Sequence, residues 1–167
     1  MYNDWNFKKG NAKTRLKILR HKRLFNKLWT NAVIVMDYCR EVWAKVIFEW
    51  PTNNLYWKLP KVKKYFQQER WSKCNIHGCA YGLVSSVATG RPIEKPWTLA
   101  TDMLSLSKIA RKCDCYSRKG ESPPRLRRGE KHAPCAGKDT KLTESYPLQL
   151  AKEFHSMFKR CPTGVSQ

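Results

Sequence analysis

The chain has 167 residues, 41% of them hydrophobic and 12% aromatic, and its 33 Lys and Arg against 13 Asp and Glu give a formal charge of +20. This length suits one domain with its own core, and the apolar content excludes a disordered chain. The charge favours a polyanionic partner, nucleic acid first and an anionic membrane surface second; the alternative is a generically basic intracellular protein.

The amino-terminal quarter of the chain predicts a long helix. Nine Lys and Arg and no acid lie between Lys8 and Lys27. We expect residues 1–13 to form a basic, flexible start and residues 14–44 to form a helix whose first half is basic and whose second half is buried. The apolar stripe of this helix comprises Leu24, Leu28, Ala32, Val35, Cys39, Val42 and Val46, with Phe25, Trp29, Val33, Met36 and Trp43 beside it. Cys39 is therefore predicted to be a small core residue.

Short apolar runs and helical patterns alternate through the rest of the chain. The predicted strands are residues 46–50, which end at Pro51, "CAYGL" (79–83) and "WTLAT" (97–101). Helices are expected after Pro60, after Asp102 and over residues 145–160, with a Pro/Arg-rich Cys/His loop over 111–144. This alternation predicts a single three-layer α/β domain over residues 1–167 with a largely parallel sheet.

The cysteines indicate a reducing compartment. There are seven of them, an odd number, and neither a signal peptide nor an apolar stretch of about 18 residues is visible. We expect an intracellular, nuclear protein that does not enter a membrane. In such a compartment Cys beside His favours a metal site over a disulfide.

The loop between residues 112 and 135 carries two pairs of metal-ligand residues. Cys113 and Cys115 stand at one end, and His132 and Cys135 at the other. Four such ligands suit a tetrahedral zinc site, whose binding energy would offset the entropy of closing the loop. The alternatives are unliganded thiols and, less favoured, a disulfide.

A second window, "CNIHGCAYGL", holds Cys74, His77 and Cys79. These residues suit a structural role at a turn before a strand better than a metal site of their own. In a further arrangement one of them meets Cys113 or Cys115 in a shared site.

Basic and aromatic residues supply candidate nucleic-acid contacts, Lys and Arg to phosphates and Trp to bases. The alternative to phosphate contact is that these Lys and Arg residues simply form a solvated face of the protein. The candidates are Lys8, Lys9, Lys13, Arg15, Lys17, Arg20, Lys22, Arg23, Trp50, Trp57, Arg125, Arg127, Arg128 and Lys131.

Catalytic patterns are scarce. The sequence has no nucleophile elbow, phosphate-binding loop or His-Glu-x-x-His zinc motif. Glu49, at the end of the first predicted strand, is the one candidate catalytic residue, and an exposed or structural role is its alternative.

Five sequence blocks carry a family resemblance. They are "KGNAKTR" (9–15), "FEWP" (48–51), "GCAYGL" (78–83), "KPWTLAT" (95–101) and "HAPCAGKDTKLTESYP" (132–147). In this order they resemble a methyltransferase-like domain of transposon and retroelement polyproteins, itself similar to a divergent cytosine-5 DNA methyltransferase. The resemblance implies that Glu49 matches the glutamate that hydrogen-bonds the target cytosine, although Trp50 and Pro51 replace the Asn and Val that follow it in those enzymes.

The same resemblance implies a partial domain. Neither the Gly-rich loop for S-adenosylmethionine nor the Pro-Cys nucleophile is found in this sequence. We therefore expect a Rossmann-methyltransferase-like carboxyl-terminal half that does not bind S-adenosylmethionine alone. The expected function is DNA or RNA binding by a protein of mobile-element origin. The alternatives are an incomplete methyltransferase-like domain that a missing half or a partner chain completes, and a structural subunit that coats RNA or DNA.

Overall fold

The computed structural model describes residues 4–88, 90–115, 126 and 129–160. The chain divides into two compact units, Met1–Ala44 and Lys45–Gln167. The first unit contains helix α1 (Asp4–Lys9) and the 30-residue helix α2 (Ala12–Glu41). Asn11 caps α2, because its side-chain oxygen accepts a hydrogen bond from the backbone N–H of Thr14 at 2.9 Å. None of the helices in the described residues is long and apolar enough to cross a membrane.

Helix α2 buries a different face from the one that the sequence predicted. Its buried residues are Ile18, Phe25, Trp29 and Met36. The predicted stripe is exposed at Leu24, Leu28, Val35 and Val42, and Cys39 is half-buried. The helix carries two adjacent apolar faces of the same period, so periodicity predicts the helix but cannot choose between the faces. Burying the aromatic face removes more apolar area from water.

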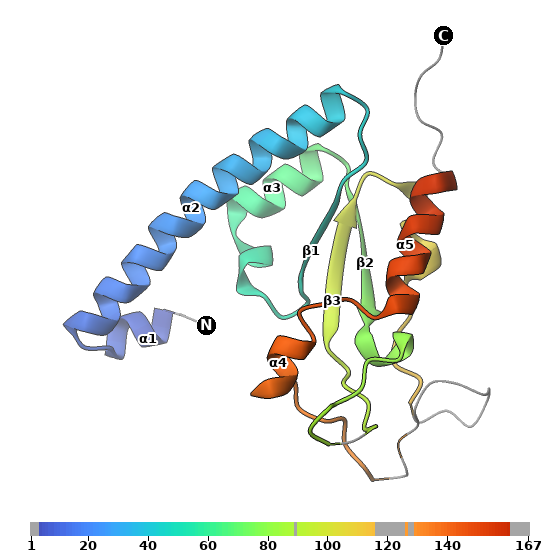
Figure 1. The fold of residues 1–167 in the computed structure, drawn as a ribbon. Helices are drawn as coiled ribbons and strands as arrows, with labels where there is room; N and C mark the ends of the chain where they lie inside the picture. The colour runs from blue at the N-terminus through green and yellow to red at the C-terminus, as the bar shows by residue number, and fades with distance from the viewer. Residues whose placement is uncertain (1–3, 89, 116–125, 127–128, 161–167) are drawn as a thin grey trace. The chain divides into compact units, whose positions relative to one another are not determined.

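The second unit is built on a three-stranded antiparallel sheet (Figure 1), so the predicted Rossmann-like parallel sheet is wrong. Its strands are β1 (Ile47–Pro51), β2 (Ser72–His77) and β3 (Pro96–Thr101), in the order β1-β3-β2. β3 lies in the centre and runs antiparallel to both neighbours, with Glu49 and Cys74 both opposite Leu99. A parallel neighbour needs a long crossover, usually a helix, but among the described residues between β2 and β3 the helical element is a short 3₁₀ helix, η2 (Gly78–Tyr81).

One predicted strand was also misplaced. "CAYGL" lies in η2 and the turn after it, where Gly82 has a φ of +81°. The real strand β2 precedes it and reads "SKCNIH", in which only Ile76 is fully buried. Its two apolar residues, Cys74 and Ile76, do alternate with polar ones, but a pattern of two residues is too short to predict a strand, so its pairing with β3 is visible only in the fold.

Helical elements cover both faces of the sheet. On one face, Phe48 and Trp50 of β1 contact η1 (Leu55–Lys58) and α3 (Pro60–Gln68), with ring centroids 5.4 Å apart for Phe48–Phe66 and 5.1 Å apart for Trp50–Trp57. On the other face, Leu99 and its neighbours form the main core with η3 (Leu104–Ile109) and α5 (Leu148–Arg160). The last short helix, α4 (Lys138–Leu142), precedes α5.

Candidate metal centre

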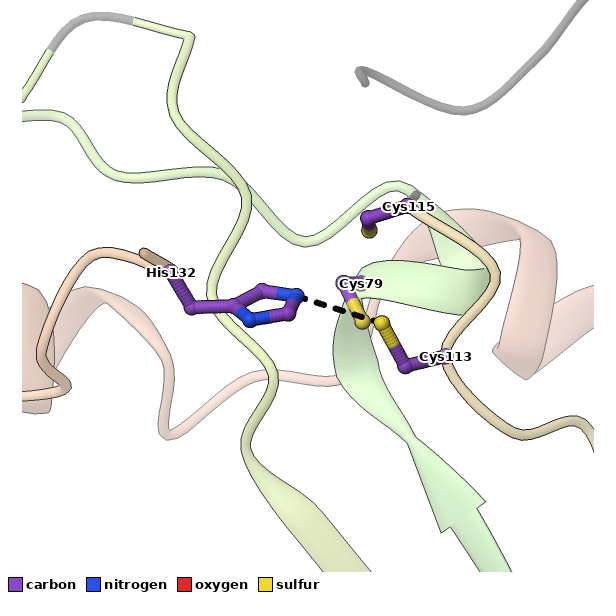
Figure 2. A group of neighbouring side chains, drawn as sticks. All are labelled: Cys79, Cys113, Cys115 and His132. Carbon is purple, nitrogen blue, oxygen red and sulfur yellow. Dashed lines mark hydrogen bonds between the residues drawn. The ribbon is translucent and has the colours of Figure 1, made fainter. Parts of the chain in front are cut away.

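Four side chains from three separate segments meet beyond the end of β2. They are Cys79 of η2, Cys113 and Cys115 from the segment after η3, and His132 from the segment before α4. One ligand atom of each lies within 4.8 Å of those of the other three, and the Cys113 Sγ is 3.2 Å from the His132 Nε2. Figure 2 shows the four side chains pointing toward one another. This Cys₃His cluster could hold a metal ion.

Glycine and the local backbone position Cys79. A Cβ on Gly78 would lie 2.6 Å from the Leu83 Cδ2 and 3.3 Å from the Trp97 ring, so any larger residue there would require the Leu83 side chain to shift. The N–H of Gly78 donates to the carbonyl of Glu94 at 2.7 Å, and the N–H of Gly82 donates to the carbonyl of Cys79 at 3.0 Å. The 3₁₀ turn is thus held at both ends, and the Cys79 thiol is fully buried.

Backbone hydrogen bonds also hold the other two segments. The N–H of His77 donates to the carbonyl of Arg111 at 2.9 Å, just before Cys113. The N–H of Ala133 donates to the carbonyl of Pro92, also at 2.9 Å, just after His132. Leu126 completes a small apolar cluster with Cys79, Cys113 and Cys115, and its N–H donates to the carbonyl of Cys115 at 3.0 Å.

The Glu94 carboxylate lies behind the histidine of the cluster. One of its oxygens is 3.9 Å from the Nδ1 of His132, and the other is 3.1 Å from the Nδ1 of His77. The first distance is an electrostatic contact rather than a hydrogen bond. Because the Nε2 of His132 faces Cys113, the Nδ1 is left to face the carboxylate. A carboxylate in this place favours the tautomer that leaves Nε2 available to a metal.

Burial keeps the thiols of Cys79 and Cys115 protonated while no metal is bound. It raises the pKa of Cys79, and the neighbouring Cys115 and Cys113 raise it further. Burial is also the main cause that raises the pKa of Cys115, to about 11. A cation that binds here must displace these protons, because the thiolate is the metal ligand.

The structure brings together three of the four ligands predicted from the loop, with Cys79 in the fourth place. Cys135 lies outside the cluster: it is exposed, and its Sγ is 3.2 Å from the Thr143 Oγ1. The arrangement in which a residue of the second window meets Cys113 and Cys115 is the one observed. Cys74 of the same window is not in the cluster; its Sγ is 3.8 Å from the Leu106 carbonyl, and burial raises its pKa to about 11.

Most of the predicted nucleic-acid contacts are exposed. All nine Lys and Arg between Lys8 and Lys27 are exposed on or beside α1 and α2, as is Lys131. Arg125, Arg127 and Arg128 lie outside the described residues.

The two predicted stacking residues lie in an aromatic cluster. Trp50 and Trp57 are half-buried, and the Lys73 ammonium lies 4.7 Å from the centroid of the Trp57 ring. The exposed cations of the segment that follows Trp57 were not among the predicted nucleic-acid contacts. The sequence feature that could have revealed them is the stretch from 58 to 73, which has one acid, Glu69, and six basic residues. These six are Lys58, Lys61, Lys63, Lys64, Arg70 and Lys73.

Glu49 connects β1 to the start of α5. Its Oε2 accepts a hydrogen bond from the Tyr146 hydroxyl at 2.9 Å, and its Oε1 is buried without a hydrogen-bond partner among the described residues. Burial raises the pKa of this carboxyl, opposed by the Tyr146 hydrogen bond and the charge of Lys95. These contacts describe a structural acceptor between two elements.

No protein-family model, curated protein or solved structure matches the chain. What the protein does must therefore be inferred from the Cys₃His cluster and from the charge of the chain itself.

Proposed function

We propose that this protein binds nucleic acid through the basic segment Lys8–Lys27 and that its Cys₃His cluster holds a structural zinc ion. The observation that carries the first part is the basic segment itself, nine exposed cations without an acid. Phosphates are the ligands that such an array attracts, since each contact releases counterions from the polyanion. The aromatic cluster with Lys73 adds a second surface where unpaired bases can stack.

The ligand set supports zinc over other metals. Three thiols and an imidazole suit a borderline-soft ion with tetrahedral preference, whereas calcium and magnesium prefer oxygen ligands. In a tetrahedral zinc site the sulfurs stand about 3.8 Å apart, because each Zn–S bond is about 2.3 Å long. The 4.8 Å limit on the separations in the cluster requires only small movements to reach that arrangement. Two of the four ligands are buried, and together they would fasten the loop after η3 to the sheet.

The blocks "FEWP", "GCAYGL" and "KPWTLAT" support the wider proposal that the chain derives from a mobile element. That proposal does not include a Rossmann-type fold.

Salt dependence of binding tests the nucleic-acid proposal. Fluorescence anisotropy with a labelled duplex should give a log–log slope of about −5 if six phosphates are neutralised. Replacing Lys13, Arg20 and Arg23 by Gln should make that slope less steep by about 2.7. The matched control replaces Lys152, Lys159 and Arg160 of α5 by Gln, which removes the same charge and should leave the slope nearly unchanged. A slope near zero for the wild type, or equal effects of the two triple variants, would contradict the proposal.

A further inference from the structure

Helix α2 carries a second apolar seam that the fold leaves exposed. We call it the exposed seam: its members follow one another at intervals of four, three, four, three and four residues and are Leu24, Leu28, Asn31, Val35, Tyr38 and Val42, the last of which is the C-cap residue directly after α2. The five apolar members have between 51% and 62% of their surface exposed. They are large side chains in a line, which distinguishes them from the scattered single apolar residues of ordinary surfaces.

The spacing of the exposed seam is that of a coiled coil. Intervals of three and four alternate with a mean of 3.5 residues, the period at which two helices keep one seam in contact along their length. A helix that packs on a single core needs one apolar face, and α2 already has one in Ile18, Phe25, Trp29 and Met36. Beside the exposed seam, Ile34 adds another apolar side chain that is 61% exposed.

We propose that the exposed seam pairs with the exposed seam of a second copy of this chain, in an antiparallel two-stranded coiled coil. The seam is self-complementary in this direction. Leu24 of one copy faces Val42 of the other, and Leu28 faces Tyr38, so large apolar side chains meet in both outer layers. Asn31, the polar member, faces Val35 of the other copy on each side of the two-fold axis, where an amide reduces the stability of the pairing.

Charge selects the antiparallel direction. Lys27 and Glu41 occupy equivalent flanking positions of the heptad, and antiparallel pairing places Lys27 of each copy across from Glu41 of the other. Parallel pairing would set the two basic segments Lys8–Lys27 side by side. Antiparallel pairing places the two Leu24 about 27 Å apart along the axis, at 1.5 Å per residue. That is well beyond a Debye length of about 8 Å, so the repulsion between the basic segments is screened.

This association does not depend on metal or nucleic acid. It would give the dimer one basic segment at each end, but the pairing itself is a property of the exposed seam. Its failure in a test would leave the nucleic-acid proposal standing, and the reverse is also true.

Sedimentation equilibrium of the nuclease-treated full chain tests the pairing. The average mass should rise with protein concentration from 19.6 kDa toward twice that value. Leu28→Glu and Val35→Glu should each weaken the dimer by at least about 100-fold. Each substitution places one charged carboxylate per copy between the two helices, where water is excluded. Leu19→Glu is the matched control: Leu19 is exposed on the same helix but lies off the exposed seam, and its substitution should change nothing. Circular dichroism confirms that each variant keeps its helix content.

Charge reversal tests the direction. Lys27→Glu should weaken the dimer about tenfold, because it sets two carboxylates against each other on both sides of the axis, and Lys27→Glu combined with Glu41→Lys should restore it. A wild type that stays monomeric at about 100 μM, or equal effects of Leu19→Glu and Leu28→Glu, overturns the proposal. A dimer that Leu28→Glu dissociates but Lys27→Glu leaves unchanged overturns the antiparallel direction.

Discussion

Replacing Cys79 by Ser separates the ligand set of the structure from the one that the loop spacing predicted. Both sets contain Cys113, Cys115 and His132, and they differ only in whether Cys79 or Cys135 is the fourth ligand. A serine hydroxyl is a poor zinc ligand at neutral pH, whereas its size is close to that of a thiol. Cys79→Ser should therefore remove one ligand with little change in packing, although Cys79 is fully buried.

The expected loss of zinc affinity in Cys79→Ser follows from the number of ligands. Structural zinc contributes about 10–16 kcal/mol of binding free energy in small zinc domains at neutral pH. Divided over four ligands, this is about 2.5–4 kcal/mol for each, which corresponds to a zinc affinity about two to three orders of magnitude weaker. The Cys135 thiol is exposed and contacts Thr143, so Cys135→Ser should leave zinc affinity unchanged.

Competition with a chromophoric chelator measures the affinity, and elemental analysis measures the stoichiometry. We expect one equivalent of zinc in the wild type and in Cys135→Ser, and substoichiometric zinc in Cys79→Ser. Wild-type zinc affinity in Cys79→Ser together with loss of zinc in Cys135→Ser would refute the assignment of the fourth ligand. Absence of bound metal from the wild type after incubation with zinc would refute the site itself.

Glu94→Gln should weaken zinc binding about 10–100-fold in the same chelator assay, since the carboxylate no longer orients His132, and unchanged affinity would show that Glu94 has no such role. Gly78→Ala should lower the free energy of unfolding in urea by about 1–3 kcal/mol, because the added methyl group overlaps the Leu83 side chain; a variant as stable as the wild type would contradict that contact. The raised pKa of Glu49 means that the folded state holds the proton more tightly, so this group's contribution to stability should fall as pH rises from its ordinary pKa of 4.5 toward the folded value. Glu49→Gln should remove that part of the pH dependence in chemical unfolding measured from about pH 4 to 7, and an unchanged pH profile would show that Glu49 is not the group responsible.

The sequence by itself determined those elements whose signals are local. The period of α2, Pro60 at the start of α3 and the apolar run of β3 each act within one segment, so these two helices and the central strand could be predicted close to their observed bounds. Helix α1 lies within the predicted flexible start and α4 within the predicted loop, so both predictions were wrong there. The Cys-x-Cys pair and His132 could be singled out as metal-ligand residues for the same reason, because Cys and His in a loop are informative without knowledge of the fold.

The tertiary structure decided which segments meet. Cys79 lies far from Cys113 and His132 in the sequence, and only the turn after β2 and the hydrogen bonds of the neighbouring segments bring it to them, whereas Cys135 is near His132 in sequence but outside the cluster in space. The insertion of β3 between β1 and β2 likewise depends on pairing between distant residues, and an alternation of strands and helices is compatible with parallel and antiparallel sheets alike. The buried face of α2 is a further example, because its two apolar faces have the same period and periodicity alone does not show which of them is buried.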